Sequence, residues 1–454
     1  MIEHLGDIVG ADFLLVGPET LGYMYDEVEY MLRPIANEES IVVKPKSAGE
    51  ISRILEYSQE ECIPVVVRGG GTGLCGAATP IEKSIVISTE RLNKIIEIDN
   101  KNMVAVLEAG VTLADLLEEL TNHHGIGFPV HPGDEGAHIG GMAATNAGGA
   151  RAVRHGVMRK HILGMEVVLA NGEIINLGGK LLKDNAGYNL MHLIIGSEGT
   201  LAVVTKVILR LYPEDKYTAT IIASFESAED ASAACLDILA GGTVPLAVEY
   251  QDRHLFEGAA EMIGKKWQIT KGTADLLIIV SEAHESMFYS SCRRIYDICQ
   301  KHNSPEQYFA GKKSEQETLL KIRSQSYEYI KDIIGHSFDM AVPVAAVPAF
   351  MYGLAKLADE YSTVTNITAH IADGNIHNDI ILVDGKMPDY AEELKNKMYK
   401  LCFQFGGTIT GEHGIGKLRR QDLKLQKSEQ ELKLMREIKK AFDPKGTLNP
   451  GTVI

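Results

Sequence analysis

Residues 68–76, RGGGTGLCG, constrain the fold of this chain more than any other stretch, because five of the nine are glycine. They follow an apolar run, residues 63–67, that is typical of a buried strand. Glycine lets successive backbone N–H groups point into one concavity, and such nests bind phosphate oxygens. A tight surface turn would need only one or two glycines. The loop therefore predicts a cradle for the phosphates of a nucleotide.

The same loop contains the glycine spacing of the Rossmann dinucleotide fold, at Gly71, Gly73 and Gly76. A Rossmann loop opens a helix at its third glycine, and an acidic residue follows about 20 positions later. Here residues 77–80 indicate a turn, and residues 84–88 indicate a short strand. The loop therefore joins a strand to a strand, which excludes the Rossmann fold.

Two more glycine-rich stretches follow, at residues 133–149 and 196–201. Small residues dominate the first, which suits either close approach of a planar ligand or tight helix packing. The second runs into an apolar strand at residues 202–205. Taken with the first loop, these stretches predict one extended nucleotide cofactor that lies across all three.

Length and charge narrow the class of protein. A chain of 454 residues predicts two or more domains. A net charge of −16 argues against nucleic acid as a partner. The six cysteines include no C-x-x-C pair, which argues against an iron–sulfur cluster and fits a reducing cytoplasm. The first residues lack the basic region of a secretory signal, and we expect no transmembrane segment.

The order of periodic segments predicts an α+β protein. We expect a lead-in at residues 1–35, a cofactor domain at 36–216, a second domain at 217–405 and a C-terminal segment at 406–454 that returns to the first domain. The cofactor domain opens with a β-α-β unit whose helix has capping residues at Ser47 and Glu50. The second domain alternates strands and amphipathic helices, which predicts an antiparallel sheet with helices on one face. Examples are strands at 217–225 and 274–280 and helices at 227–240 and 285–301.

Two histidines flank a hairpin signal in the second domain. An Asp-Gly pair between β-type residues is typical of a two-residue turn, here Asp373-Gly374. That register places His370 opposite His377, with Cβ atoms roughly 5 Å apart. Such a separation suits two imidazoles on one metal ion, although two ordinary histidines are the alternative.

The motif GEHGIG, residues 411–416, offers a candidate third metal ligand and a candidate general base. Glu412 as metal ligand and His413 as general base form a coherent pair, although both also suit a solvated loop. Neighbours in an extended loop tend to point in opposite directions. We therefore expect His413 to stand beside the substrate rather than on the same ion.

Six segments, in this order, resemble the FAD-linked 2-hydroxyacid oxidoreductases of the vanillyl-alcohol oxidase superfamily. This family includes glycolate oxidase flavoprotein subunits, D-lactate dehydrogenases and D-2-hydroxyglutarate dehydrogenase. The resemblance implies a PCMH-type FAD-binding domain and an antiparallel-sheet α+β substrate (cap) domain. The segments are RGGGTGL (68–74), IGGMAATNAGG (139–149), GSEGTL (196–201), AHIADGNIH (369–377), GEHGIG (411–416) and FDPKGTLNPG (442–451).

The resemblance also implies roles for single residues. It implies a divalent metal on His370, His377 and Glu412, with zinc favoured over manganese or iron. It makes His413 the base and places a substrate-carboxylate arginine at Arg323. The FAD contacts that it implies are Arg68, Gly69, Gly70, Gly71, Thr72, Gly73, Leu74, Gly76, Pro132, Gly133, Gly140, Gly141, Ala144, Thr145, Asn146, Gly148, Gly149, Glu198, Gly199, Val204 and Asn449.

The chain departs from the family pattern at three places and lacks the histidine that binds flavin covalently in related enzymes. Residues 320–322 replace a more aromatic run before Arg323, and Ala372 stands where glycine is usual. Residues 337–339 lack the basic residue that some members use for a second carboxylate, which argues against a dicarboxylate substrate. Thr72 and Leu74 stand near the position of a flavin-linking histidine, so we expect noncovalent FAD.

The expected activity is oxidation of a 2-hydroxy acid, D-lactate or glycolate, to the 2-oxo acid. Electrons then pass to an electron-transferring flavoprotein or an iron–sulfur subunit, and quinone and oxygen are the alternative acceptors. A homodimer is the oligomeric state left open. Three alternatives remain at this point. They are a flavin-binding accessory subunit, a redox-neutral flavin transferase such as the ether-lipid alkyl synthase, and a non-haem iron oxygenase using the two histidines and Glu412.

Overall fold

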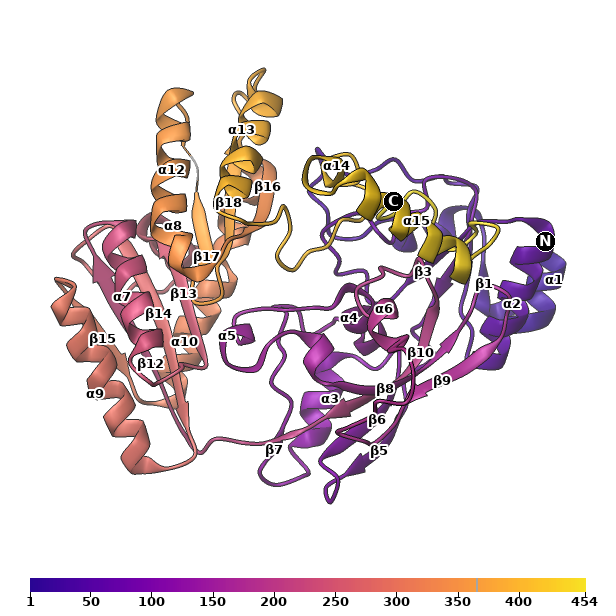
Figure 1. The fold of residues 1–454 in the computed structure, drawn as a ribbon, viewed down its shortest axis with the longest axis horizontal. Coiled ribbons are helices and arrows are strands. Elements are labelled where there is room, and N and C mark those ends of the chain that lie inside the picture. The colour runs from indigo at the N-terminus through magenta and orange to yellow at the C-terminus, as the bar shows by residue number, and fades with distance from the viewer. Residues whose placement is uncertain (365) are drawn as a thin grey trace. The chain divides into compact units, whose positions relative to one another are not determined.

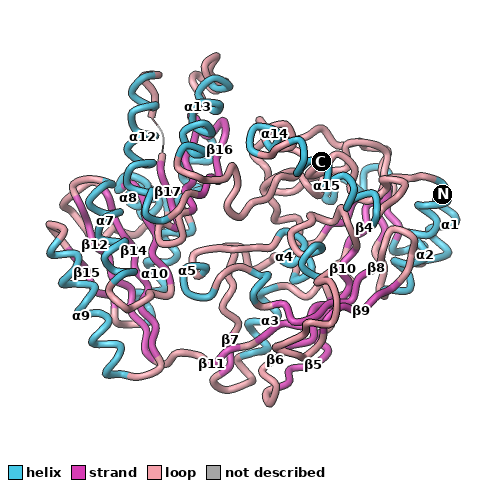
Figure 2. The backbone as a smooth tube through the Cα atoms, viewed as in Figure 1, coloured by secondary structure: helices cyan, strands magenta, loops and turns pink. Residues whose placement is uncertain are grey.

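The computed structural model describes residues 1–364 and 366–454. The chain forms two compact units, each of which is described below by itself. Figure 1 labels their elements, and Figure 2 separates helices from strands. Unit 1 consists of Met1–Gly148, Val157–Pro213 and Glu412–Ile454, and unit 2 consists of Gly149–Gly156 and Glu214–Gly411.

The first sheet of unit 1 has the strand order β1-β2-β4-β3. Strands β2 and β3 both pair in parallel with β4, and α2 (Ala48–Glu61) connects them as the sequence predicts. The hydroxyl of Ser47 caps α2 by accepting the N–H of Glu50 at 3.2 Å. The strands are β1 (Leu14–Leu15), β2 (Ile41–Val43), β3 (Val65–Arg68) and β4 (Ile85–Ser88).

Helices and the tail cover this sheet within unit 1. Helices α1 (Ile2–Val9) and α2 pack apolar side chains against one face of β2, β3 and β4. Met24 and Ala36 pack against Val42 and Val86 in a separate cluster. At the edge, Val65 forms a parallel bridge with Leu448, so the C-terminal segment extends the sheet beyond β3. Residues 1–36 and the tail are therefore integral parts of unit 1.

The second sheet of unit 1 is antiparallel, with the order β5-β6-β10-β8-β9. Its core packs the strands against α3 and α4, whose inward side chains Leu113, Leu116 and Ile139 are fully buried. The elements are β5 (Ile95–Asp99), β6 (Val104–Glu108), β8 (Ile162–Val168), β9 (Ile174–Gly178), β10 (Val203–Arg210), α3 (Leu113–Leu120) and α4 (Ile139–Thr145), with β7 (Ile126–Gly127) pairing β11 (Tyr212–Pro213) separately.

Unit 2 is built on an antiparallel sheet with the order β15-β12-β14-β13-β17-β18-β16. Strand β12 spans Tyr217–Phe225, the range that the sequence predicts. The remaining strands are β13 (Ala247–Asp252), β14 (Ala274–Glu282), β15 (Gln307–Ala310), β16 (Ile334–Ala341), β17 (Ile367–His370) and β18 (Asn375–Ile381).

Helices cover both faces of this sheet, although the sequence predicts one face only. Ile222 of β12 packs with Phe256 of α8 and Ile322 of α10. Tyr217 lies on the opposite face, because side chains alternate along a strand. Its ring lies 6.2 Å from that of Phe288 on α9. The helices are α7 (Ala228–Ala240), α8 (Arg253–Met262), α9 (Glu285–Lys301), α10 (Lys313–Ser324), α11 (Ser326–Ile330), α12 (Val347–Glu360) and α13 (Ala391–Gln404).

Several short helices and one longer C-terminal helix, α15, complete the two units. They are η1 (Ala11–Phe13), η2 (Gly17–Tyr23), η3 (Met158–Lys160), α6 (Met191–Ile194), α14 (Leu423–Gln426) and α15 (Glu429–Phe442) in unit 1, and α5 (Ala152–His155), η4 (Lys331–Ile333) and η5 (Val344–Ala346) in unit 2. Across the described residues, every helix is too short or too polar to cross a membrane.

Candidate functional site

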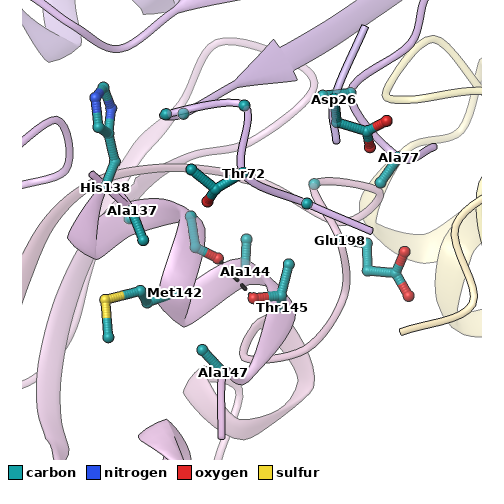
Figure 3. Close-up of a pocket in the computed structure, with 18 of the residues that line it drawn as sticks. Asp26, Thr72, Ala77, Ala137, His138, Met142, Ala144, Thr145, Ala147 and Glu198 are labelled. Atoms are coloured by element: carbon teal, nitrogen blue, oxygen red, sulfur yellow. Dashed lines mark hydrogen bonds between the residues drawn. The ribbon is translucent and has the colours of Figure 1, made fainter. Parts of the chain in front are cut away.

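A pocket in unit 1 brings the three glycine-rich stretches together with the C-terminal segment (Figure 3). The glycine loop after β3 forms one wall and α4 forms another. In α4, the Thr145 hydroxyl donates to the Gly141 carbonyl at 3.0 Å, the dashed line of Figure 3. The predicted FAD contacts that border the pocket are Gly69, Gly70, Gly71, Thr72, Gly73, Leu74, Pro132, Gly140, Gly141, Ala144, Thr145, Gly148, Glu198, Gly199, Val204 and Asn449.

The glycines show why these walls need small residues. A Cβ on Gly70 would lie 2.5 Å from the carbonyl oxygen of Gly136, and one on Gly140 would lie 2.5 Å from the Cβ of Ala109. Both glycines therefore let neighbouring backbones approach closely. Gly141 differs, because a Cβ there would meet no atom within 4 Å. Since Gly141 borders the pocket, that space belongs to the cavity, and the walls fit a large ligand lying close against the backbone.

Five predicted contacts do not border the pocket in the described structure: Arg68, Gly76, Gly133, Asn146 and Gly149. The Arg68 guanidinium packs against Gly71 of the glycine loop and donates to the Gly22 carbonyl at 3.1 Å. Asn146 ends α4 in a left-handed conformation, and its side-chain oxygen accepts the N–H of Arg159 at 2.9 Å. Gly149 begins the segment that belongs to unit 2. The structure thus gives Arg68 and Asn146 structural contacts that the sequence does not reveal.

Other pocket residues are missed by sequence reasoning. Asp26 borders the pocket with only 4% of its surface exposed, and burial raises the pKa of its carboxyl. His138 also borders it, beside the Thr89 hydroxyl at 3.0 Å, and burial lowers its pKa. Asp26 belongs to the expected lead-in, whereas His138 lies in the glycine-rich stretch 133–149, where the sequence indicates a role only for the small residues and Asn146.

Glu412 and His413 border the same pocket. Gly148 makes room for Glu412, because a Cβ on Gly148 would lie 3.0 Å from the Glu412 Oε2. The His413 Nε2 lies 3.9 Å from the Glu412 Oε1. The expectation that these neighbours point apart is therefore wrong, because the glycines around them allow a compact turn instead of an extended strand.

In unit 2, His370 and His377 converge, but not through the predicted register. His370 pairs with Asn375, and Thr368 pairs with His377. The two histidines are thus diagonal neighbours on one face of the hairpin, and their ring centroids lie 5.5 Å apart. The turn is longer than two residues because Gly374 is held elsewhere, its carbonyl accepting the N–H of Val342 at 3.0 Å.

A buried carboxylate links His370 to Arg323. Glu249, on β13, lies 2.7 Å from the His370 Nδ1 through one oxygen. Its other oxygen accepts from Arg323, at 3.1 Å from Nε and 2.8 Å from the terminal nitrogen. The Glu249 side chain is 4% exposed. The only sequence signal for this residue is a charge between apolar neighbours, Val248 and Tyr250, and a buried charge requires a partner.

His377 is also backed by a buried acid. Its Nδ1 lies 3.8 Å from the Asp339 Oδ1, and Asp339 accepts from Asn375 and from the N–H of Gly411. Because a carboxylate only accepts, the contact with Glu249 puts the hydrogen of His370 on Nδ1 and the lone pair on Nε2. Metal-binding histidines typically have this carboxylate on the second nitrogen. The donor chemistry of unit 2 therefore fits a metal ion, and the third predicted ligand, Glu412, belongs to unit 1.

Two family models match the chain, and the second begins where the main part of unit 2 begins but also includes the C-terminal segment of unit 1. Residues 40–178 match the FAD binding domain, and residues 214–453 match the C-terminal domain of FAD linked oxidases. A D-lactate dehydrogenase of Archaeoglobus fulgidus is 39% identical over 453 residues, covering 100% of this chain and 99% of that protein. The glycolate oxidase subunit GlcD of Bacillus subtilis is 33% identical over 438 residues, covering 95% of this chain and 91% of its own length.

Solved structures support the fold. A 4-ethylphenol oxidase from Gulosibacter chungangensis superposes with a TM-score of 0.79 at 16% identity, covering 100% of this chain and 96% of that chain. A p-cresol methylhydroxylase superposes with a TM-score of 0.76 at 17% identity, with the same coverages of 100% and 96%. The PCMH-type fold that the family resemblance implies is confirmed. The chain belongs to the FAD-linked oxidases and is an FAD-dependent oxidoreductase of the D-lactate dehydrogenase and glycolate oxidase type.

Proposed function

We propose that the protein oxidises a small 2-hydroxy acid, D-lactate or glycolate, to the 2-oxo acid, with noncovalent FAD and a divalent metal. The names of the two relatives support this substrate class. The observation that carries the proposal is that the Glu249 carboxylate contacts both Arg323 and His370. Arg323 is the proposed cation for the substrate carboxylate, and His370 is a proposed metal ligand.

When bound, FAD supplies the hydride acceptor, and the metal supplies a Lewis acid that lowers the pKa of the substrate hydroxyl. Arg323 binds the substrate carboxylate through guanidinium N–H groups while Glu249 holds its Nε edge. His370, His377 and Glu412 hold the metal. His413 takes the hydroxyl proton on an imidazole nitrogen.

A single carboxylate is favoured for the substrate. In unit 2, the strand that carries His377 pairs with β16, where Ser337, Phe338 and Asp339 stand. Asp339 is an acidic residue and is fully buried, with its Oδ2 accepting from Thr410 and Gly411. A second substrate carboxylate beside residues 337–339 would meet an acidic side chain and no arginine or lysine. D-Lactate and glycolate fit this requirement, and malate or 2-hydroxyglutarate does not.

The electrons leave to a partner protein, an electron-transferring flavoprotein or an iron–sulfur subunit. The word "subunit" in the name of the Bacillus subtilis relative supports a multi-component oxidase.

The test is a panel of D- and L-hydroxy acids with an artificial dye as acceptor, with FAD and metal measured on the same sample. We expect dye reduction with D-lactate or glycolate and little with dicarboxylates. A protein that carries FAD but no stoichiometric metal, and that reduces the dye with none of these acids, would instead be an accessory subunit.

A further inference from the structure

Glu198 holds the segment that carries the proposed base. Within unit 1, its Oε1 accepts the N–H of Ile415 at 2.8 Å, and its Oε2 accepts the N–H of Gly416 at 2.7 Å. These donors stand two and three positions after His413. The Glu198 residue is 7% exposed, so water does not compete strongly for its oxygens.

The carboxylate also lies directly against the residue that follows His413. A Cβ on Gly414 would lie 2.8 Å from the Glu198 Oε1, and Gly414 has a φ of +91°. Only glycine fits this combination of close approach and left-handed backbone without strain. Residues 414–416 therefore wrap around one carboxylate, which fixes the backbone from which the His413 side chain projects.

The backbone of Glu198 is itself anchored to the pocket walls. Its N–H donates to the Ala144 carbonyl of α4 at 2.8 Å. Its carbonyl accepts from the Asn449 side chain at 2.7 Å, and the Asn449 N–H donates to Val65 at 2.7 Å. Glu198 thus connects α4, the end of the sheet and the segment after His413, and its carboxylate is a fixed support.

We propose that Glu198 is a positioning residue for His413, acting through the backbone of residues 414–416. This proposal rests on the proposed role of His413 as general base. Hydrogen bonds to a charged acceptor are stronger than neutral ones, and a shift of a reacting group by about 1 Å can cost about 10²-fold in rate. A neutral side chain of the same size at position 198 should therefore slow proton removal without emptying the pocket.

The first test is Glu198→Gln in the FAD-loaded protein. The amide has one oxygen and one NH₂ group, so one of the two backbone N–H groups would face another donor. We expect flavin reduction to slow by about 10- to 10²-fold, with unchanged KM and an FAD Kd within about twofold of wild type. Glu166→Gln is the matched control, because Glu166 accepts from Thr205 and Lys206 in the same unit but not from this segment.

A double variant decides whether Glu198 acts through His413. On a His413→Asn background, Glu198→Gln should cause no further loss, because the group that it positions is gone. The proposal would be overturned if the rate losses of the two single variants multiply in the double variant. A large rise in the FAD Kd of Glu198→Gln would also overturn it, and would show that Glu198 contacts the cofactor directly. If Glu198→Gln does not fold, Glu198→Asp, which withdraws the carboxylate by one methylene, takes its place in the same cycle.

Amide hydrogen exchange separates this proposal from the proposed function. Glu198→Gln should speed exchange of a peptide covering residues 412–418, whereas Glu166→Gln should not. If His413→Asn keeps the wild-type rate of flavin reduction, His413 is not the base. The positioning proposal is then also wrong, even if Glu198→Gln speeds amide exchange in residues 412–418. If His413→Asn is slow but Glu198→Gln changes neither exchange nor reduction, only the positioning proposal fails.

Discussion

Glu249 lies between His370 and Arg323, and removal of its negative charge should affect both residues. Glu249→Gln keeps the shape but weakens the hydrogen bonds to His370 and Arg323. We expect metal affinity to fall about 10- to 10²-fold, the usual scale for a residue behind a metal-binding histidine, while FAD stays bound. His370→Ala should remove the metal altogether.

The measurement is metal content after dialysis against a competing chelator. Glu282→Gln is the control, because its oxygen accepts from Ser291 within unit 2 and from neither site residue. Equal metal retention in Glu249→Gln and wild type would show that the carboxylate does not support the ligand.

His413 and Glu412 can be separated by their effects on metal, although their side-chain tips lie 3.9 Å apart. His413→Asn should keep FAD and metal but lose about 10²- to 10⁴-fold in the reductive half-reaction, as expected for a general base. Glu412→Gln should instead weaken metal retention. Stopped-flow flavin reduction, with metal measured on the same sample, tests both. Loss of metal from both variants alike would make His413 a further ligand.

The sequence predicts site residues that stand in short motifs, but it does not predict the residues that hold those side chains in place. His370, His377, Glu412 and His413 stand in short signatures whose chemistry can be read directly. Glu249 lies 121 positions before His370, and the pairing exists only because β13 and β17 are neighbours in the sheet. A contact of that kind depends on tertiary structure, so it has no local pattern.

At the scale of elements, α4 offers a test of where the cofactor lies. Alanine stabilises a helix interior by about 1 kcal/mol relative to glycine. At Gly141 the added methyl group meets no protein atom within 4 Å but enters the pocket. Gly141→Ala should therefore stabilise the FAD-free protein by roughly 0.5–1 kcal/mol and weaken FAD binding.

Gly6→Ala in α1 is the matched control, because its added methyl group also meets no atom within 4 Å and Gly6 does not border the pocket. It should stabilise the protein without changing the FAD Kd. Urea unfolding of the FAD-free protein and FAD titration measure both effects. Unchanged FAD affinity in Gly141→Ala would mean that the cofactor does not cover this part of α4.

Elements were predictable where periodicity alone decides them. Strand Tyr217–Phe225 and helix Glu285–Lys301 have the predicted bounds, because each has a strong pattern and clear ends. The hairpin register was not predictable. The Asp-Gly signal favours a two-residue turn, but the Gly374 carbonyl accepts the N–H of Val342, which lies outside the hairpin. A contact outside the hairpin therefore outweighs the preference for a two-residue turn. As a result, His370 and His377 are diagonal neighbours instead of direct partners.

At the scale of the whole molecule, the charge of −16 should oppose an anionic substrate. Salt screens such repulsion, with a Debye length of about 30 Å at 0.01 M and about 8 Å at 0.15 M. We expect kcat/KM for D-lactate or glycolate to rise over this range while kcat stays constant. A fall instead would mean that the cation at Arg323 dominates the field felt by the substrate. Steady-state rates in sodium chloride at fixed pH, with a neutral dye at saturation, measure this.

The pocket of unit 1 takes its walls from positions as far apart as Asp26 and Asn449. A ribosome adds on the order of 5–20 residues per second, so tens of seconds separate the synthesis of the first wall from that of the last. During that interval the glycine loop has been made, but Leu448, which bridges the Val65 edge of its sheet, has not. Stable capture of FAD must therefore wait until nearly all of the described chain has left the ribosome, and a translation arrest before Asn449 would leave a protein that cannot complete its cofactor pocket.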